Sequence, residues 1–217
     1  MENAFKFNED AAPAFIQSDE ESYIPQFMRT AVEGKDDESK VPSGALYGTA
    51  MHRFMECFDF ARDDYNSSFD EQLKYMEATK SLSEDEFARI NHRKLKVFLD
   101  DDLSNRMSKA ALNGKLYKEK PFVFGSDAKE LFDDDDVTDE MILVQGIIDV
   151  FFEEDDGIIL MDYKTDKVDE DNELVLRYEK QLKLYKDAIE HAYDVPVKEV
   201  LIYSFALERS INICTTN

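Results

Sequence analysis

Cysteine is scarce in this chain, and a long apolar segment is absent. The only two cysteines among 217 residues are Cys57 and Cys214, and they show no spacing typical of a metal site. A four-cysteine iron–sulfur cluster within this chain is therefore excluded. No apolar run approaches the roughly 20 residues that span a bilayer, and the first residues lack the apolar core of a signal peptide. We expect a cytoplasmic protein with no membrane partner, in keeping with the low cysteine content.

The sequence also lacks an ATP-binding motif and an excess of basic residues. The sequence has no Gly-x-x-x-x-Gly-Lys-Ser/Thr loop, so we expect no ATP site and no helicase motor in this chain. Basic residues are few: 26 stand against 49 acidic ones, for a formal charge of −23. Because DNA-binding proteins usually present a basic surface, this composition alone argues against nucleic acid. Much of the acid, however, falls in short runs such as 133–136 and 153–156, which we expect to be loops.

The remaining composition suits one globular domain. Hydrophobic residues make up 43% of the chain, including 16 Phe and 10 Tyr, which is ample material for a core. We predict an irregular segment over 1–42, whose last part is a flexible loop, followed by a helical part over 43–114. An α/β core should cover 115–208. The tail over 209–217 is either a strand or ragged.

The helical part carries recognisable start and stop signals. One amphipathic helix is predicted from Gly48 to about Ala61, and a helical stretch from Phe69 to Gly114. Within that stretch, 83–86 has the pattern of a capping box, with Ser at the N-cap and Glu three residues on. Gly114 is expected to end the last helix. A strand from Lys118 to Phe124 and an acidic loop over 125–140 should follow.

The core is expected to contain a β-hairpin that carries two acids. An apolar run leads to Asp149, an acidic turn ending in Asp156-Gly157 follows, and a second apolar run reaches Asp162. This pattern predicts an Asp-Gly hairpin with Asp149 near the end of its first strand. Asp162 and Lys164 are two residues apart, so their side chains should share a face. Hard divalent cations prefer carboxylate oxygens, and a lysine can stabilise phosphate charge, so these residues are a candidate Mg²⁺ site.

A long amphipathic helix should follow the hairpin, from about Asn172 to Tyr193, with apolar residues every three to four positions. Gln181 and Tyr185 are four apart and should lie on one face of it. A strand over 199–207 is predicted next, which gives the order β, β, α, β of an α/β core.

Together these segments resemble the RecB-type nuclease domain of the PD-(D/E)XK superfamily, and within it the C-terminal nuclease domains of AddA-type helicase–nuclease subunits. The segments that carry the resemblance are Gly48-Thr49-Ala50-Met51-His52, Lys118-Glu119-Lys120-Pro121-Phe122, Gly146-x-x-Asp149, Asp162-Tyr163-Lys164-Thr165 and Tyr178-x-x-Gln181-x-x-x-Tyr185. The resemblance implies an α/β fold with a restriction-endonuclease-like core, in which helices flank a mixed central sheet, preceded by a helical N-terminal part.

The resemblance also implies roles for individual residues. His52, Asp149 and Asp162 would bind Mg²⁺, with the backbone carbonyl of Tyr163 as a further ligand; Mn²⁺ would accept the histidine more readily. Lys164 would position a water molecule or stabilise the charge that develops on phosphate. From the residues alone, a lone helical histidine such as His52 is usually structural, and Asp149 could be a turn-forming acid at a strand end.

Three more residues belong to the predicted site. By resemblance, Gln181 and Tyr185 would shape the site and contact DNA, although Gln181 could be a solvated helix residue and Tyr185 part of the core. Glu119 could reach the site as an accessory acid, or form an ordinary ion pair on its strand.

The function implied is that of a metal-dependent exonuclease acting on single-stranded DNA in double-strand-break repair by homologous recombination. Its partners would be an AddA-type helicase portion and an AddB-type subunit. We expect the isolated chain to bind DNA weakly. A stand-alone nuclease of the same superfamily and a catalytically inert nuclease-fold interaction module remain alternatives.

Overall fold

The computed structural model describes residues 43–127 and 141–213. The predicted segment over 1–42, most of the acidic loop and Cys214 lie outside these residues. The chain divides into two compact units. One comprises Ser39–Lys120 and Ile148–Asn217, and every predicted site residue belongs to it. The described part of the other consists of strand residues 121–127 and 141–147.

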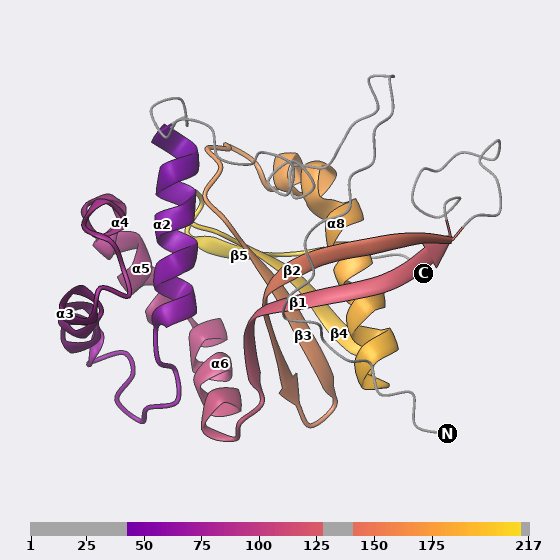
Figure 1. The fold of residues 1–217 in the computed structure, drawn as a ribbon, viewed down its shortest axis with the longest axis horizontal. Helices are drawn as coiled ribbons and strands as arrows, with labels where there is room; N and C mark the ends of the chain where they lie inside the picture. The colour runs from indigo at the N-terminus through magenta and orange to yellow at the C-terminus, as the bar shows by residue number, and fades with distance from the viewer. Residues whose placement is uncertain (1–42, 128–140, 214–217) are drawn as a thin grey trace. The chain divides into compact units, whose positions relative to one another are not determined.

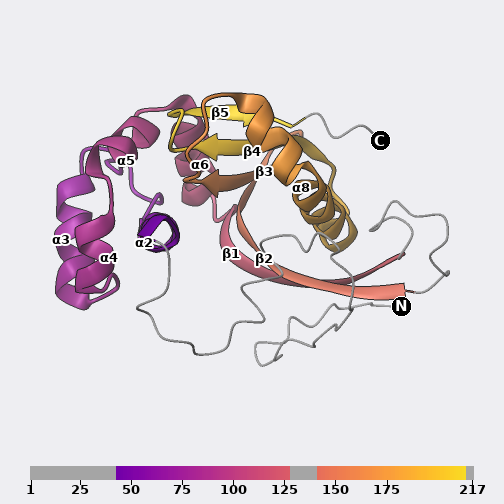
Figure 2. The ribbon, with the colours of Figure 1, turned by 90° about the horizontal axis from the view of Figure 1, so that it is seen from above.

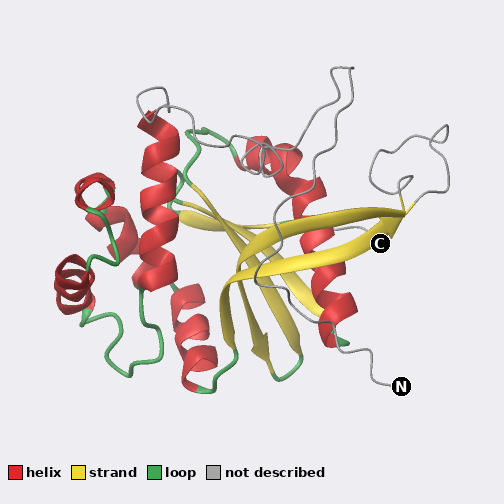
Figure 3. Ribbon diagram, in the orientation of Figure 1, coloured by secondary structure: helices red, strands yellow, loops and turns green. Residues whose placement is uncertain are grey.

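The N-terminal part of the larger unit is helical, as predicted (Figure 3). Its helices are α2 (Ser43–Cys57), α3 (Phe69–Thr79), α4 (Glu84–Arg89), α5 (His92–Leu99) and α6 (Asp102–Leu112). The capping box is confirmed: Ser83 Oγ accepts a hydrogen bond from the Glu86 backbone N–H (3.2 Å), and the Glu86 carboxylate accepts one from the Ser83 backbone N–H (2.8 Å). Gly114, with φ of 70°, turns the chain out of α6 as expected.

The prediction for α2 was wrong at both ends, since the helix covers Ser43–Cys57 instead of 48–61. The Lys118 ammonium donates to the carbonyl oxygens of Met55 (3.3 Å), Glu56 (2.5 Å) and Phe58 (2.6 Å). These carbonyls therefore need no further helical N–H groups, and the chain can leave the helix while Phe58 stays buried. Cys57 ends the helix half-buried.

A five-stranded mixed sheet forms the core, in the order β1-β2-β3-β4-β5. The strands are β1 (Leu116–Asp127), β2 (Met141–Glu154), β3 (Gly157–Lys164), β4 (Val197–Ser204) and β5 (Arg209–Asn212). β3 pairs antiparallel with β2 and parallel with β4, and β4 pairs antiparallel with β5. Helix α8 (Asp171–Tyr193) makes the crossover between the two parallel strands (Figure 1). The predicted α/β fold with a mixed sheet is confirmed.

Several strand boundaries differ from the prediction. β2 continues to Glu154, so Asp149 lies well inside the strand, and the two turn residues are Asp155 and Asp156. Gly157 begins β3 with φ of 151°, where an added Cβ would come within 2.9 Å of the Pro196 carbonyl oxygen. The glycine is thus required by close backbone packing beside the turn.

Other boundaries moved at the ends of β1 and β4. β1 runs on to Asp127, so residues 125–127 are strand instead of loop. β4 ends at Ser204, and residues 205–208 form a turn that leads into β5. The tail therefore contains a strand, because β5 completes the hydrogen bonding of β4. None of the described helices is long and apolar enough to cross a membrane.

Strands β3 and β4 are covered on both faces. Figure 2 shows α8 on one side of them and the helical part on the other. Successive side chains of β3 point alternately to the helical part and to α8. Those of Ile159, Met161 and Tyr163 join the core of the helical part. Asp162 and its neighbours two positions away therefore face α8, whose buried residues are Leu174, Tyr178, Gln181, Leu182, Tyr185, Ala188 and Ile189. This alternation brings the charged residues of β3 and the polar residues of α8 to one face of the sheet.

Candidate active site

A glycine allows α2 to lie close to the end of β3. A Cβ on Gly48 would stand 3.0 Å from Oγ1 of Thr165, the residue that follows β3. His52 lies four residues later, on the same face of the helix. The close approach therefore brings the imidazole of His52 over the sheet, where its ring centroid lies 6.0 Å from that of Tyr163 in an edge-on arrangement.

Asp149 lies where β2 separates from β3. The described pairing of the two strands begins at Val150↔Met161. Beyond that pair, the backbone N–H of Tyr163 donates to Asp149 Oδ2 (2.9 Å). The Asp149 side chain therefore takes the place of a backbone acceptor on the paired strand. The same oxygen lies 3.4 Å from Nδ1 of His52. The structure therefore brings together the histidine and the acid that the sequence placed 97 positions apart.

Asp162 and Lys164 form an ion pair on the same face of β3, as predicted. Lys164 Nζ lies 2.6 Å from Asp162 Oδ2, and the two side chains are 14% and 2% exposed. The Lys164 ammonium is the charged partner of Oδ2, which has no other hydrogen-bond donor among the described residues. A buried carboxylate oxygen with unused acceptor capacity is a feature that a cation would satisfy.

Glu119 reaches the same cluster from β1. One ligand atom from each of His52, Glu119 and Asp149 lies within 4.8 Å of the others. Glu119 has φ of 48°, a left-handed conformation that is unusual for a non-glycine residue inside a strand. Of the two alternatives that the sequence left open, this geometry favours the accessory acid.

The histidine and its acid stabilise each other's charged form. Burial disfavours the imidazolium, but the carboxylate of Asp149 outweighs that effect and raises the pKa of His52 to about 9. Burial likewise disfavours the carboxylate of Asp149, but His52, Lys164 and the Tyr163 N–H hold its pKa below the usual value. Without a cation, the proton on His52 supplies positive charge to the cluster.

The other two acids are shifted in the opposite direction. Burial raises the pKa of Asp162 to about 6, against the opposing effect of Lys164. Burial and the nearby Asp149 carboxylate raise the pKa of Glu119 to about 7. Burial disfavours the Lys164 ammonium, but Asp162 and Asp149 prevail and its pKa lies above the usual value. Lys164 is therefore a cation at neutral pH and has no free lone pair to act as a base.

The two residues predicted on α8 are also in place. Gln181 Nε2 donates to the hydroxyl oxygen of Tyr185 (2.7 Å), and both side chains are buried. Burial and the charge of Asp162 raise the pKa of Tyr185, so its hydroxyl keeps its proton. Gln181 is thus not a solvated helix residue. The side chain of Tyr163 points to the opposite face, where its hydroxyl lies 3.9 Å from Met107 Sδ.

Some residues around the site carry contacts that the sequence did not predict. Lys118 fixes the end of α2, and Thr165 packs against Gly48. Tyr178 begins one of the segments that carry the resemblance but was given no role of its own, and its ring centroid lies 4.1 Å from Lys164 Nζ. Its hydroxyl donates to Asp166 Oδ2 (3.0 Å). These contacts join different elements, which helical and strand periodicity do not reveal.

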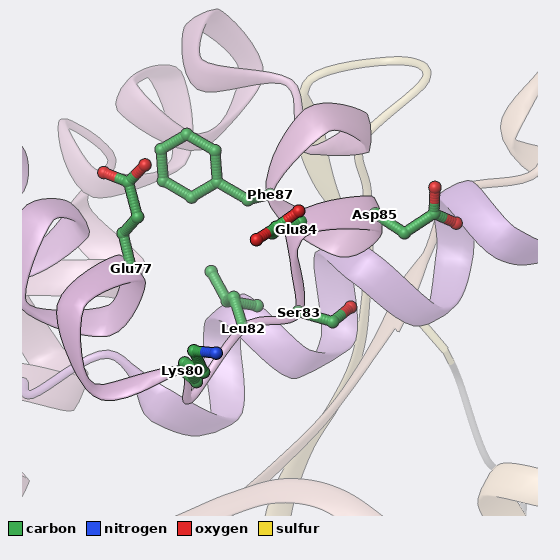
Figure 4. Close-up of a pocket in the computed structure, with 7 residues that line it drawn as sticks. All are labelled: Glu77, Lys80, Leu82, Ser83, Glu84, Asp85 and Phe87. Atoms are coloured by element: carbon green, nitrogen blue, oxygen red, sulfur yellow. The ribbon is translucent and has the colours of Figure 1, made fainter.

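A separate hollow lies in the helical part (Figure 4), lined by Glu77, Lys80, Leu82, Ser83, Glu84, Asp85 and Phe87. None of these residues belongs to the carboxylate cluster. Three of them are acids and one, Lys80, is basic.

Comparisons with known proteins identify the family. The sequence model of the PD-(D/E)XK nuclease superfamily matches residues 25–211. The chain belongs to the PD-(D/E)XK nuclease superfamily.

Its similarity to particular nucleases is also clear. The chain is 31% identical to the A subunit of the ATP-dependent helicase/nuclease of Lachnoclostridium phytofermentans, over 89% of this chain and 16% of that protein. It is 36% identical to the protein of the same name from Clostridium perfringens and 35% identical to that from Alkaliphilus oremlandii, each over 87% of this chain and 15% of the relative. The predicted resemblance to AddA-type proteins is confirmed. The chain spans about one sixth of the length of these relatives.

Proposed function

We propose that this chain is a metal-dependent deoxyribonuclease domain that cleaves single-stranded DNA as an exonuclease within an AddA-type helicase–nuclease. The observation that carries the proposal is the cluster at the point where β2 separates from β3. There the ligand atoms of His52, Glu119 and Asp149 converge, and the ion pair of Asp162 with Lys164 lies close enough to act electrostatically on His52 and Asp149. The similarity to the A subunits of helicase/nucleases supports the biological setting, which is double-strand-break repair with an AddB-type partner.

The residues present fit a divalent cation. Asp162 offers a buried oxygen whose one partner among the described residues is the Lys164 ammonium, so a lone pair is left for a cation. His52, Glu119 and Asp149 present ligand atoms within 4.8 Å of one another. A donor set of carboxylate oxygens suits Mg²⁺, and the single imidazole is accepted more readily by Mn²⁺. We propose His52, Asp149, Asp162 and the Tyr163 carbonyl as ligands, with Glu119 as an accessory acid.

The chemistry is hydrolysis of a phosphodiester bond. When bound, a divalent cation would supply Lewis-acid activation of water and partial neutralisation of the phosphate. Lys164 contributes a second positive charge, held by Asp162, that stabilises the charge developing on the phosphate oxygens. Glu119, with a pKa raised to about 7, is suited to exchange a proton near neutral pH.

The acidity of the chain bears on how DNA reaches the site. With a formal charge of −23, the chain should repel a polyanion over most of its surface. A strand delivered by an adjoining motor needs little affinity of its own for this domain. We therefore expect weak binding of DNA to the isolated chain, and a tight complex that resists salt would contradict this.

Two alternatives make different predictions. A stand-alone nuclease of the same superfamily would cleave DNA without any helicase portion. An inert interaction module would bind no metal. The retention of His52, two carboxylates and a charged lysine in one cluster favours a working nuclease, because burying these charges is costly without a function.

The deciding experiment is cleavage of end-labelled linear single-stranded DNA with Mg²⁺, with Mn²⁺ and with EDTA. Asp162→Ala should abolish metal-dependent cleavage, whereas Asp155→Ala, which removes an exposed acid from the turn of the same hairpin, should not. If the parent chain cleaves nothing, calorimetry with Mn²⁺ separates the remaining cases. Binding that Asp162→Ala removes supports a nuclease that needs its motor, and no binding supports the inert module.

A further inference from the structure

Lys164 is held between two partners of different kinds. On one side, Nζ lies 2.6 Å from Asp162 Oδ2. On the other, it lies 4.1 Å from the ring centroid of Tyr178, within the range of a cation–π interaction. A lysine side chain is long and flexible, so a single ionic contact would leave its ammonium free to move around the carboxylate. The ring restricts that movement.

The ring of Tyr178 is itself fixed. Its side chain is 6% exposed on the face of α8 that covers the sheet. Its hydroxyl donates to Asp166 Oδ2 (3.0 Å), and Asp166 Oδ1 accepts from Arg177 Nη1 (2.7 Å). The loop after β3 therefore holds the start of α8 so that the face of the ring points at Lys164.

We infer that Tyr178 is a positioning residue for the reaction. The negative face of its ring holds the Lys164 ammonium where it can contact the scissile phosphate. This inference rests on the proposed function. It adds a residue that is not itself a candidate metal ligand. Tyr178 acts only through Lys164, so its loss should affect turnover and leave metal binding intact.

The test weakens the quadrupole of the ring while keeping its shape. Tyr178→Phe is the reference, and phenylalanine carrying one, two or three ring fluorines is then placed at position 178 of the full chain. Fluorine withdraws electron density from the ring face, so turnover of single-stranded DNA should fall stepwise. The whole series should span about 2- to 30-fold, the range expected for a cation–π interaction. Tyr178→Leu, which removes the ring, should lose at least as much.

Two measurements accompany turnover. Calorimetry should give a Mn²⁺ affinity that stays within about twofold across the series, the size of a small environmental effect. In NMR spectra of the chain without metal, the ε-CH₂ protons of Lys164 should be shifted upfield by the Tyr178 ring, and this shift should vanish in Tyr178→Leu. The matched control is the same fluorinated series at Tyr193, on the same helix, whose ring centroid lies 5.2 Å from that of Phe151. Fluorination at Tyr193 should not change turnover.

Each outcome either supports or overturns the positioning role of Tyr178. A stepwise fall in turnover with constant Mn²⁺ affinity supports the positioning role. A flat series, an absent upfield shift, or a fall matched by equal loss of Mn²⁺ affinity overturns it while leaving the nuclease assignment standing. If the parent chain neither cleaves DNA nor binds Mn²⁺, the proposed function itself fails, and the role of Tyr178 fails with it.

Discussion

The two faces of β3 are both buried, but they differ in chemistry. Met161 and Tyr163 face the helical part, where aromatic rings fill the space. Asp162 and Lys164 face α8, where a carboxylate and an ammonium are buried together. Burial stabilises the first face through apolar contact and costs free energy on the second, because charges lose their hydration. The first face therefore maintains the fold, and the second is retained for reactivity.

The largest effect on stability should come from the apolar face. Phe98 is fully buried, and its ring centroid lies 4.5 Å from that of Tyr203 and 5.7 Å from that of Tyr163. Phe98→Ala should lower the free energy of unfolding by about 3–5 kcal/mol, because it leaves a cavity. Chemical denaturation measures this, with Tyr75→Ala, at a side chain that is 68% exposed, as the control. Equal losses for the two variants would contradict the assigned core.

Substitutions on the charged face should affect cleavage as well as stability. Asp162→Asn should reduce cleavage by about 10²–10³-fold and also destabilise the fold, because it leaves the Lys164 ammonium without its carboxylate. Adding Lys164→Gln should restore stability but not cleavage. Thermal unfolding and cleavage are measured on the same three proteins. Recovery of cleavage in the double variant would show that this pair is structural.

The protons on the charged face should compete with a metal. His52, with a pKa raised to about 9, is protonated at neutral pH and must lose that proton before its nitrogen can bind a cation. Apparent Mn²⁺ affinity should therefore rise with pH, by about tenfold per unit for each proton displaced, and the contribution of His52 should level off above about pH 9.

Calorimetry in buffers of different ionisation enthalpy counts the protons released. His52→Gln should remove about one proton from the count at pH 7, the number held by a single imidazolium. A count that the substitution leaves unchanged would exclude His52 as a ligand.

The sequence predicted each face to a different extent. Strand alternation correctly placed Asp162 beside Lys164. The resemblance selected His52 and Asp149, and in the fold His52 Nδ1 lies 3.4 Å from Asp149 Oδ2. Ends of elements were less predictable: α2 stops where Lys118, from β1, satisfies its last carbonyls. Such a contact spans 60 or more positions, so local periodicity carries no trace of it. The ring of Tyr178 against Lys164 escaped prediction for the same reason.

The smallest expected effect tests whether the helical part supports the fold without taking part in the chemistry. Ser83 caps α4 and forms a reciprocal box with Glu86 at the surface. Ser83→Ala should lower the free energy of unfolding by about 1 kcal/mol, since a helix N-terminal N–H loses its acceptor. Ser83→Asp should restore most of it, because aspartate is an equally good cap. Mn²⁺ affinity and cleavage should stay at the parental level in both variants. A change in either would mean that the capped end of α4 is coupled to the charged face of β3, and that the two regions do not divide stability and reactivity between them.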